Sequence, residues 1–439
     1  MLRLMLLLAV LWIANAPAHA AEEAPLEAQV ELVVPPGAQA GPDFDVERAT
    51  QAWIETLSPQ QRAKSDAYFE GGYWLQLWSF LYGLATAWLL LRLRWSAWMR
   101  DRAERWSRRG YGRTAIYALM YVPVSTLLAL PLAWYAGFFR EHQYGMATQT
   151  LPEWLGDQGK GLVVAMILGA LFLSLLYWVF RRAPRTWWVW GTGVSMAFLV
   201  FVMTLAPVLI DPLFNDYKAL PPGPLRDNIL GVAHATGVPA SEVYWFDASR
   251  QTKRISANVA GFGETTRIAL NDNLLYRSSQ PSIEAVMGHE LGHYVLNHIY
   301  EMLVYFAAIL LLGFALVAWS FDRVVARWGS GWGVKGIADP AGLPLLGALF
   351  SAYLFLLTPV MNTIVRTNEA EADRFGIAVS GQADGFAQVA MQLSEYRKIS
   401  PGEWEEWLFY DHPSGHNRVR AAMEWKAEQL RKQAAAASP

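Results

Sequence analysis

The sequence predicts a multi-span α-helical membrane protein, with six or seven transmembrane helices, that also carries a smaller α+β domain outside the bilayer. Three observations predict it: 54% of the 439 residues are hydrophobic, only 17% are charged, and long apolar runs recur along the chain. Soluble domains contain about 25% charged residues, so the deficit favours lipid as the solvent for much of the surface. The polar stretches between the runs leave room for a soluble domain of modest size.

The charge and cysteine counts exclude several classes of protein. The chain has 36 basic and 38 acidic residues and a net charge of -2, so it lacks the positive field that a nucleic-acid-binding protein needs. It has no cysteine, which excludes disulfides, thiolate metal sites and thiol nucleophiles. Any metal must therefore bind to His, Asp or Glu side chains.

The first twenty residues have the pattern of an export signal. A short basic start precedes an apolar run from Leu4 to Ala14, and Ala18-His19-Ala20 is a small-x-small cleavage site. The run is shorter than the ~20 residues that span a bilayer. We therefore predict a signal peptide over 1–20, with an uncleaved first membrane helix as the alternative, and a polar N-terminal segment without a large core over 21–71.

Six apolar runs have the length of membrane spans. We predict four transmembrane helices within 72–210 and two more within 301–361, because Trp and Tyr gather at the ends of these runs, as is typical of the membrane–water interface. The alternative, core helices of a soluble protein, does not account for six such runs. Their approximate ranges are 73–91, 114–139, 161–180, 186–210, 301–321 and 341–361.

The short loops between the runs predict the orientation, because Lys and Arg are retained on the cytoplasmic side. Eight basic residues lie in 92–113, three in 181–185 and three in 322–340, against two in 140–160. The three basic loops are therefore expected in the cytoplasm. In a bacterial inner membrane the soluble segments 211–300 and 362–439 would then face the periplasm.

The first soluble segment, 211–300, reads as an α+β domain. A helix is predicted over 224–236, and short β-prone strands are predicted over 243–246 and 267–270. Gly261-Phe262-Gly263 between the strands is a weak nucleotide-binding pattern, because it lacks a third glycine and a following helix. A bend beside an edge strand is the favoured interpretation.

The most informative motif is His289-Glu290-Leu291-Gly292-His293, an H-E-x-x-H run inside a helix predicted to start near Pro281. On a helix, positions i and i+4 lie on one face about 5 to 6 Å apart, so both imidazoles can bind one zinc ion. Glu290 lies one position further round the helix, where it can take a proton from the attacking water. The motif predicts a zinc-dependent hydrolase.

A catalytic zinc ion needs a third protein ligand, and the best candidates follow the last apolar run. The run 369–373 is expected to begin a helix there, with Glu369 and Asp373 on one face. We expect Glu369 to bind zinc and Asp373 to accept the outer N–H of a ligating histidine, which fixes its tautomer. Glu371 is expected to be solvated, and a charged surface helix is the alternative interpretation of the run.

These motifs resemble the type I CAAX prenyl endopeptidases, a family of integral-membrane zinc metalloproteases. The resemblance rests on the H-E-x-x-H run, on 366–373, and on His412-Pro413 followed by Arg418. Segments 211–215, 247–249 and 267–275 also match the pattern, so the resemblance covers most of 140–425.

The resemblance implies a ring of membrane helices around a large chamber, closed by a gluzincin-like zinc metallopeptidase domain. That domain would consist of 211–300, which carries the zinc helix, and of 362–439, which carries the third ligand and completes it. The resemblance also implies the roles of seven residues: His289, His293 and Glu369 as ligands of one Zn²⁺, Glu290 as the base, Asp373 behind the ligands, and His412 and Arg418 near the transition state.

Two further histidines can be judged from physical principles. A positioned hydrogen-bond donor stabilises a tetrahedral oxyanion, and His412 is a candidate for this donor. The alternative interpretation is that His412 caps a helix or lies on the surface. His298 follows His293 by five positions and has rotated off the ligand face. We predict that His298 is structural.

A peptide or protein substrate is expected to bind as an added strand along 256–260, because backbone pairing holds an extended chain whatever its side chains. Ser256, Ala257 and Asn258 stand where the family carries an Asn-Ala-Tyr-like run. This departure changes the expected contacts with substrate side chains.

The leading hypothesis is a zinc endopeptidase embedded in the lipid bilayer that acts on exported or membrane polypeptides. The basic-loop count disfavours the eukaryotic arrangement, in which the zinc domain faces the cytoplasm. The alternatives are CAAX-type processing of lipidated C-terminal peptides and a catalytically idle scaffold or transporter. The few ionisable residues within the apolar runs disfavour transport.

Overall fold

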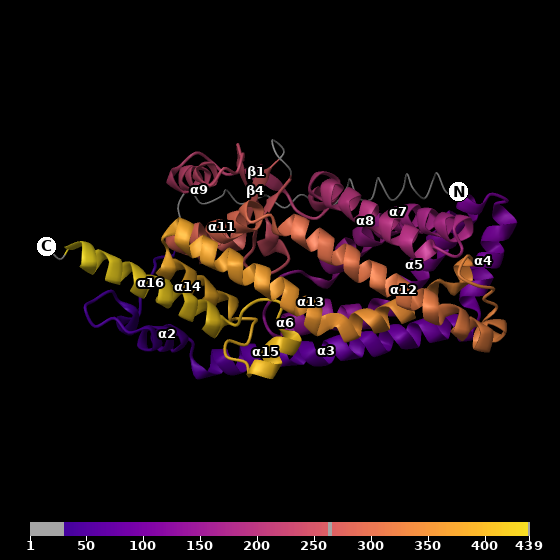
Figure 1. Ribbon diagram of the computed structural model, residues 1–439, viewed down its shortest axis with the longest axis horizontal. Helices are drawn as coiled ribbons and strands as arrows, with labels where there is room; N and C mark the ends of the chain where they lie inside the picture. The colour runs from indigo at the N-terminus through magenta and orange to yellow at the C-terminus, as the bar shows by residue number, and fades with distance from the viewer. Residues whose placement is uncertain (1–29, 262–265, 438–439) are drawn as a thin grey trace.

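The computed structural model describes residues 30–261 and 266–437. Long helices run together along the longest axis of the molecule, and a small sheet with shorter helices lies at one end (Figure 1). The predicted signal peptide, 1–20, lies outside the described residues.

Six helical segments of the described chain are long and apolar enough to cross a membrane. This confirms the six predicted spans, and the helices extend beyond the apolar runs because polar turns continue them at both ends. The segments are α3 (Pro59–Arg92), α5 (Gly110–Trp134) continued by a π turn and α6 (Arg140–Gln143), α7 (Leu151–Arg182), α8 (Trp187–Leu205) continued to Leu213, α12 (His298–Trp332) and α13 (Leu343–Ser380).

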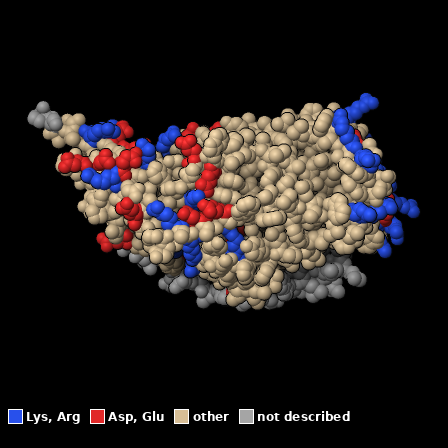
Figure 2. All heavy atoms as spheres, turned by 90° about the horizontal axis from the view of Figure 1, so that it is seen from below, with Lys and Arg blue, Asp and Glu red and all other residues tan. Residues whose placement is uncertain are grey.

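The basic loops meet at one end of these helices. Leu91, Phe180, Phe321 and Ala341, which flank the three loops, belong to one buried cluster. Helix α4 (Trp95–Trp106) runs across this end (Figure 1). Figure 2 shows Lys and Arg gathered there, a broad middle surface almost free of charge, and mixed charges at the opposite end. The uncharged middle matches a surface that faces lipid.

A four-stranded sheet lies at the opposite end, in the order β1-β2-β4-β3. Strand β2 pairs parallel with β4, and the other two pairs are antiparallel. The predicted strand 243–246 is confirmed, and the second predicted strand extends by one residue. The strands are β1 (Tyr217–Ala219), β2 (Val243–Phe246), β3 (Ala257–Ala260) and β4 (Arg267–Asn271), with α9 (Pro224–Ala235) and α10 (Asp272–Arg277) beside them. Strand β3 is an edge strand, so one of its sides pairs with no strand among the described residues.

Helix α11 (Gln280–Val295) begins at Ser279, whose side chain accepts a hydrogen bond from the backbone N–H of Ser282. Pro281 in its first turn agrees with the predicted start. One face of α11 packs with the sheet and α9, and another packs with α14 (Ala383–Leu393). Helices α15 (Glu403–Phe409) and α16 (Gly415–Ala437) complete this end of the chain.

The sequence analysis expected a polar segment without a large core over 21–71, and the structure shows two helices in the second half of this segment. Helix α2 (Val46–Ile54) buries Ala49, Trp53 and Ile54 against α14 and α16, and α3 already begins at Pro59, capped by Ser58. The apolar face of α2 is too short to form a core by itself, but it is buried once the C-terminal helices are present.

Helices α11 and α13 cross at glycines. A Cβ on Gly376 would lie 2.5 Å from the backbone nitrogen of His289, and one on Gly288 would lie 2.8 Å from the carbonyl oxygen of Gly376. Only glycine permits this approach. The crossing brings the backbone that carries Glu369 close to the H-E-x-x-H motif.

The sequence analysis expected the segment that carries Glu369 to begin a new helix, and this expectation is wrong. The segment continues the last membrane helix, because α13 runs unbroken for 38 residues from Leu343 to Ser380. No proline or glycine lies between Pro359 and Gly376. The segment that carries Glu369 is therefore joined to a membrane span by continuous helix.

Candidate metal centre

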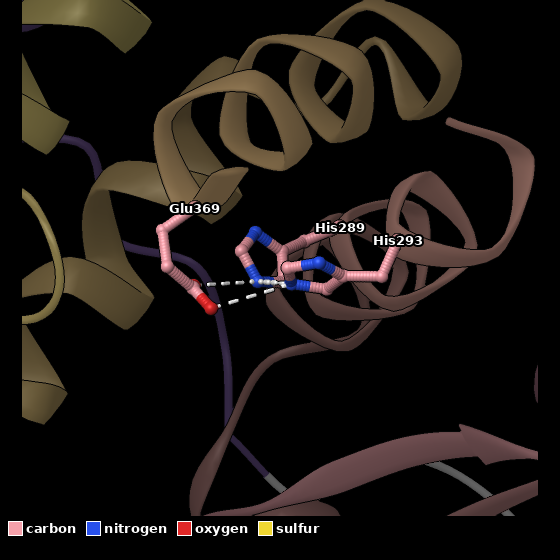
Figure 3. Close-up of side chains that lie close together, drawn as sticks. All are labelled: His289, His293 and Glu369. Carbon is pink, nitrogen blue, oxygen red and sulfur yellow. Dashed lines mark hydrogen bonds and ion pairs between the residues drawn. The ribbon is translucent and has the colours of Figure 1, made fainter. Parts of the chain in front are cut away.

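Three ligand atoms converge where α11 crosses α13 (Figure 3). The Nε2 atoms of His289 and His293 lie 3.2 Å apart. The carboxylate of Glu369 faces both rings from α13, with Oε2 3.3 Å from His289 Nε2 and Oε1 3.5 Å from His293 Nε2. In the part of the chain that the structure describes, this is the group of His, Asp and Glu side chains that could hold a metal ion.

The donor set fits zinc. Two imidazole nitrogens and one carboxylate oxygen are the ligands of many catalytic zinc sites, which keep a fourth position open for water or substrate. The three atoms lie within 4.8 Å of one another and belong to two rigid helices. The lone pairs of these nitrogen and oxygen atoms face each other, and a cation bound among them would accept all three.

Asp373 lies directly behind His289, one helical turn after Glu369. Its Oδ1 lies 2.8 Å from His289 Nδ1, so it can hold the ring with Nε2 directed at the metal position. Arg418 donates from Nε to Oδ2 of Asp373 at 2.9 Å and from Nη2 to Oδ1. The sequence analysis expected Arg418 near the transition state, whereas its guanidinium forms a bidentate pair with Asp373.

His293 is held from behind by a residue that the sequence analysis treated as structural. The Nδ1 atoms of His293 and His298 lie 2.9 Å apart, and His298 Nε2 lies 3.3 Å from Glu371 Oε2. Asn297, with φ of 60°, turns the chain so that His298 returns toward the motif. Spacing on a continuous helix could not reveal this contact, because the helix ends at Val295.

His412 approaches the site from the loop between α15 and α16. Its Nε2 lies 3.2 Å from Glu369 Oε2, and its Nδ1 lies 2.8 Å from Asp411 Oδ1. Asp411 therefore orients the ring, as Asp373 orients His289. The structure thus gathers His289, Glu290, His293, Glu369, Asp373, His412 and Arg418, from three separate segments, within one site.

The local electrostatics distinguish the residues of α11. Burial raises the pKa of Glu290 to about 7. Burial lowers the pKa of His289, but hydrogen bonds to Asp373 and Glu369 outweigh it and raise the value to about 10. Burial and the neighbouring His289 lower the pKa of His293 to about 4. Glu290 is therefore suited to exchange a proton near neutral pH.

Two cavities meet at the three ligand atoms. The larger, about 720 Å³, has mostly apolar walls and is lined by Asn258 to Gly261 and by residues of α8, α12 and α13. The smaller, about 190 Å³, is lined by Ile255 to Ala257, Tyr396 and Arg397. Glu290 and Glu369 line both cavities.

Comparison with known families agrees with this site. The model of the CAAX prenyl protease N-terminal region, described as five membrane helices, matches residues 47–216. The model of peptidase family M48 matches residues 220–426. Together the two matches cover most of the chain, including every residue of the site.

Individual proteins are also similar to this chain. An uncharacterised metalloprotease of Bacillus subtilis is 28% identical over 83% of this chain and 86% of its own length. CAAX prenyl protease 1 of Saccharomyces cerevisiae is 28% identical over 68% of this chain and 69% of its own. The crystal structure of Ste24p from S. mikatae has the same fold, with a TM-score of 0.69, 23% identity, and coverage of 86% of this chain and 94% of that one.

The fold and the site thus define an integral-membrane metalloendopeptidase. More narrowly, the chain belongs to the type I CAAX prenyl protease family, within peptidase family M48. The resemblance drawn from the motifs and the predicted fold class are confirmed.

Proposed function

We propose that His289, His293 and Glu369 bind one zinc ion and that Glu290 is the general base in peptide-bond hydrolysis. The three ligand atoms support this assignment because they converge beside a carboxylate that burial brings to a pKa of about 7. Zinc held there would polarise the scissile carbonyl and make water a stronger acid. Asp373 and His298 would position the two imidazoles.

Glu290 takes the proton from the attacking water and passes it to the leaving amine. His412 lies beside Glu369 and lines the smaller cavity, where its Nε2–H can donate to the developing oxyanion. Arg418 acts through Asp373, because both partners are buried and paired. Arg418 is therefore a positioning residue rather than a direct donor.

The observation that carries this proposal is the course of edge strand β3 past the ligands. Ser256 and Ala257 line the smaller cavity, and Asn258 begins the wall of the larger one. A peptide added to the free side of β3 would extend through both cavities, with its scissile bond at their junction. Main-chain pairing would hold substrates of varied sequence.

We further propose that the protein lies in a bacterial inner membrane with this site on the periplasmic side, acting on exported or membrane polypeptides. The support is the position of all three basic loops at the end opposite the site. A topology reporter fused after Arg431 is expected to be active only in the periplasm. A cytoplasmic signal would contradict this orientation without affecting the zinc chemistry.

The smaller cavity favours one alternative substrate, a lipidated peptide cleaved near its C-terminus. Arg397 lines this cavity and could pair with a terminal carboxylate, while the apolar walls of the larger cavity could hold the lipid. Peptides with free or amidated C-termini separate the two candidates. If amidation or Arg397→Gln lowers kcat/KM tenfold or more, C-terminal processing is favoured, and equal rates favour internal cleavage.

The decisive variant for the chemistry is Glu290→Gln. It should lower the cleavage rate by about 10² to 10⁴-fold, the typical contribution of a general base, with zinc content unchanged. Glu284→Gln, on the same helix but paired with Asn228 and Gln280, is the matched control. Full cleavage by a zinc-loaded Glu290→Gln protein would disprove the mechanism.

A further inference from the structure

A second charged cavity lies at the basic end of the molecule, far from the metal centre. It has a volume of about 200 Å³, several times the ~30 Å³ that a water molecule occupies. Residues from four elements and loops line it: Arg100, Ala103, Glu104, Arg113, Thr114, Arg181, Lys335, Ala338, Asp339 and Pro340. Neither the peptide path nor the zinc ligands account for it.

The acidic groups of this cavity are already engaged. Asp339 accepts from Arg100 Nη1 at 2.6 Å and from the backbone nitrogens of Lys335 and Ala341 at 2.9 and 3.0 Å. Glu104 lies 3.9 Å from Arg113, and both side chains are 40% exposed. With four basic and two acidic residues, the walls carry a surplus of two positive charges.

Arg181 is the group that most clearly lacks a partner. Its Nη1 donates to Thr114 Oγ1 at 3.1 Å. Its Nη2 is buried and has no hydrogen-bond partner among the described residues. A buried, unpaired donor of a charged group is costly. An anion in the cavity would satisfy it.

The cavity lies at the level of the membrane–water interface. Helix α4, which supplies Arg100 and Ala103, exposes Trp95, Trp98 and Trp106, and tryptophan prefers the depth of lipid headgroups. Arg94, with φ of 58°, turns the chain from α3 into α4 across the end of the bundle (Figure 1). The basic cavity therefore opens where phospholipid phosphates lie.

We propose that this cavity binds the phosphate of an anionic phospholipid headgroup, with Arg181, Lys335 and Arg113 as its ligands. Guanidinium groups match phosphate oxygens in geometry and charge. Basic pockets between membrane helices are suited to such headgroups. A bound lipid would link α5, α7 and the loop between α12 and α13 at the end opposite the peptidase site.

The test compares three probes on the full-length protein in a non-ionic, phosphate-free detergent: dihexanoyl phosphatidylglycerol, inorganic phosphate and dihexanoyl phosphatidylcholine. Affinity is measured by isothermal titration. We expect phosphatidylglycerol to bind with one molecule per chain and at least tenfold more tightly than phosphatidylcholine. Arg181→Gln with Lys335→Gln should weaken that binding at least tenfold.

The matched control is Arg105→Gln with Arg108→Gln, which removes two exposed charges from the same end of the molecule, outside the cavity. It should bind phosphatidylglycerol as the wild type does. Equal loss in both double variants, or no loss in either, would overturn the proposal. Inorganic phosphate that binds as tightly as phosphatidylglycerol would overturn the lipid as the ligand and leave a free-phosphate site.

If Arg181→Gln with Lys335→Gln fails to fold, Arg113→Gln with Lys335→Gln also removes two cavity charges and keeps the hydrogen bond to Thr114. The peptidase activity of each variant reports whether the chain is folded. An unchanged affinity in this second variant would overturn the proposal.

Discussion

The peptidase end buries charged side chains, whereas the middle of the helical bundle exposes apolar ones. At the peptidase end, Asp373, Arg418 and His289 are 3%, 7% and 8% exposed. In the bundle, Leu356 is 79% exposed and Val304 is 69% exposed. In the span from Trp187 to Leu213, the most apolar stretch has no buried residue.

One chain therefore folds against two solvents. Lipid accepts exposed leucine and valine, so the bundle gains little from hiding them. The peptidase end can bury charges because each is paired and hydrogen-bonded. Hydrophobic burial therefore identifies the core at one end of the molecule but not in its middle. Substitutions in the two regions test this contrast.

Asp373→Asn should have the largest effect on stability. It leaves the buried Arg418 guanidinium without its counter-ion, and such changes cost about 3 to 5 kcal/mol in the free energy of unfolding. Zinc affinity should also fall about 10 to 100-fold, because His289 loses its orienting acceptor. Chemical unfolding and competition with a chelator measure the two effects.

The matched control for that variant is Glu424→Gln on α16. Glu424 pairs with Arg420 at 3.0 Å, but both side chains are about half exposed, and such pairs contribute about 0 to 1 kcal/mol. Similar losses in the two variants would show that burial does not distinguish the two ion pairs.

Leu356→Lys tests the solvent of the middle region. If this surface faces lipid, a lysine near the centre of a span should cost about 2.5 to 3.5 kcal/mol of insertion free energy. Val33→Lys, at an apolar residue of the peptidase end that is 70% exposed, should stay within about 0.5 kcal/mol. An insertion assay for α13 measures the effect of Leu356→Lys, and unfolding of the purified protein measures the effect of Val33→Lys. An unchanged insertion free energy for Leu356→Lys would place that surface in water.

Gly376→Ala tests the glycine crossing of α11 and α13. The added methyl would collide with the backbone of His289, so we expect a loss of about 1 to 3 kcal/mol, typical of overpacking. Gly231→Ala in α9 has open space around it and should be neutral or stabilising by up to about 1 kcal/mol. Thermal unfolding separates the two, and stabilisation by Gly376→Ala would contradict the close approach.

Zinc affinity should depend on pH through His289. In the metal-free protein its pKa is raised to about 10 by Asp373 and Glu369 against the effect of burial, so between pH 7.5 and 9 it is protonated. Zinc requires the neutral ring, and each unit of pH lost should weaken binding about tenfold, about 1.4 kcal/mol. Chelator competition at several pH values measures the slope.

The comparison variant for the pH dependence is Asp373→Asn, which removes a group that raises the His289 pKa. Its slope above pH 7.5 should flatten toward zero. A wild-type affinity that does not change over this range would contradict the assigned protonation of His289.

Features that depend on local periodicity could be predicted from the sequence alone. Six apolar runs of span length predicted the membrane helices, because a helix needs about 20 such residues to cross a bilayer whatever its neighbours are. The i, i+4 spacing of His289 and His293 placed both rings on one face for the same reason. The strand at 243–246 and the start of α11 near Pro281 also followed from local pattern.

Contacts between distant groups depend on the packing of the whole chain. The burial of α2 depends on α14 and α16, far along the chain. The pairing of Arg418 with Asp373 depends on how α16 packs, and the contact of His298 with His293 depends on a left-handed turn at Asn297. These contacts are non-local, and several segments must pack together before any of them forms. For that physical reason, no pattern along the chain could specify them.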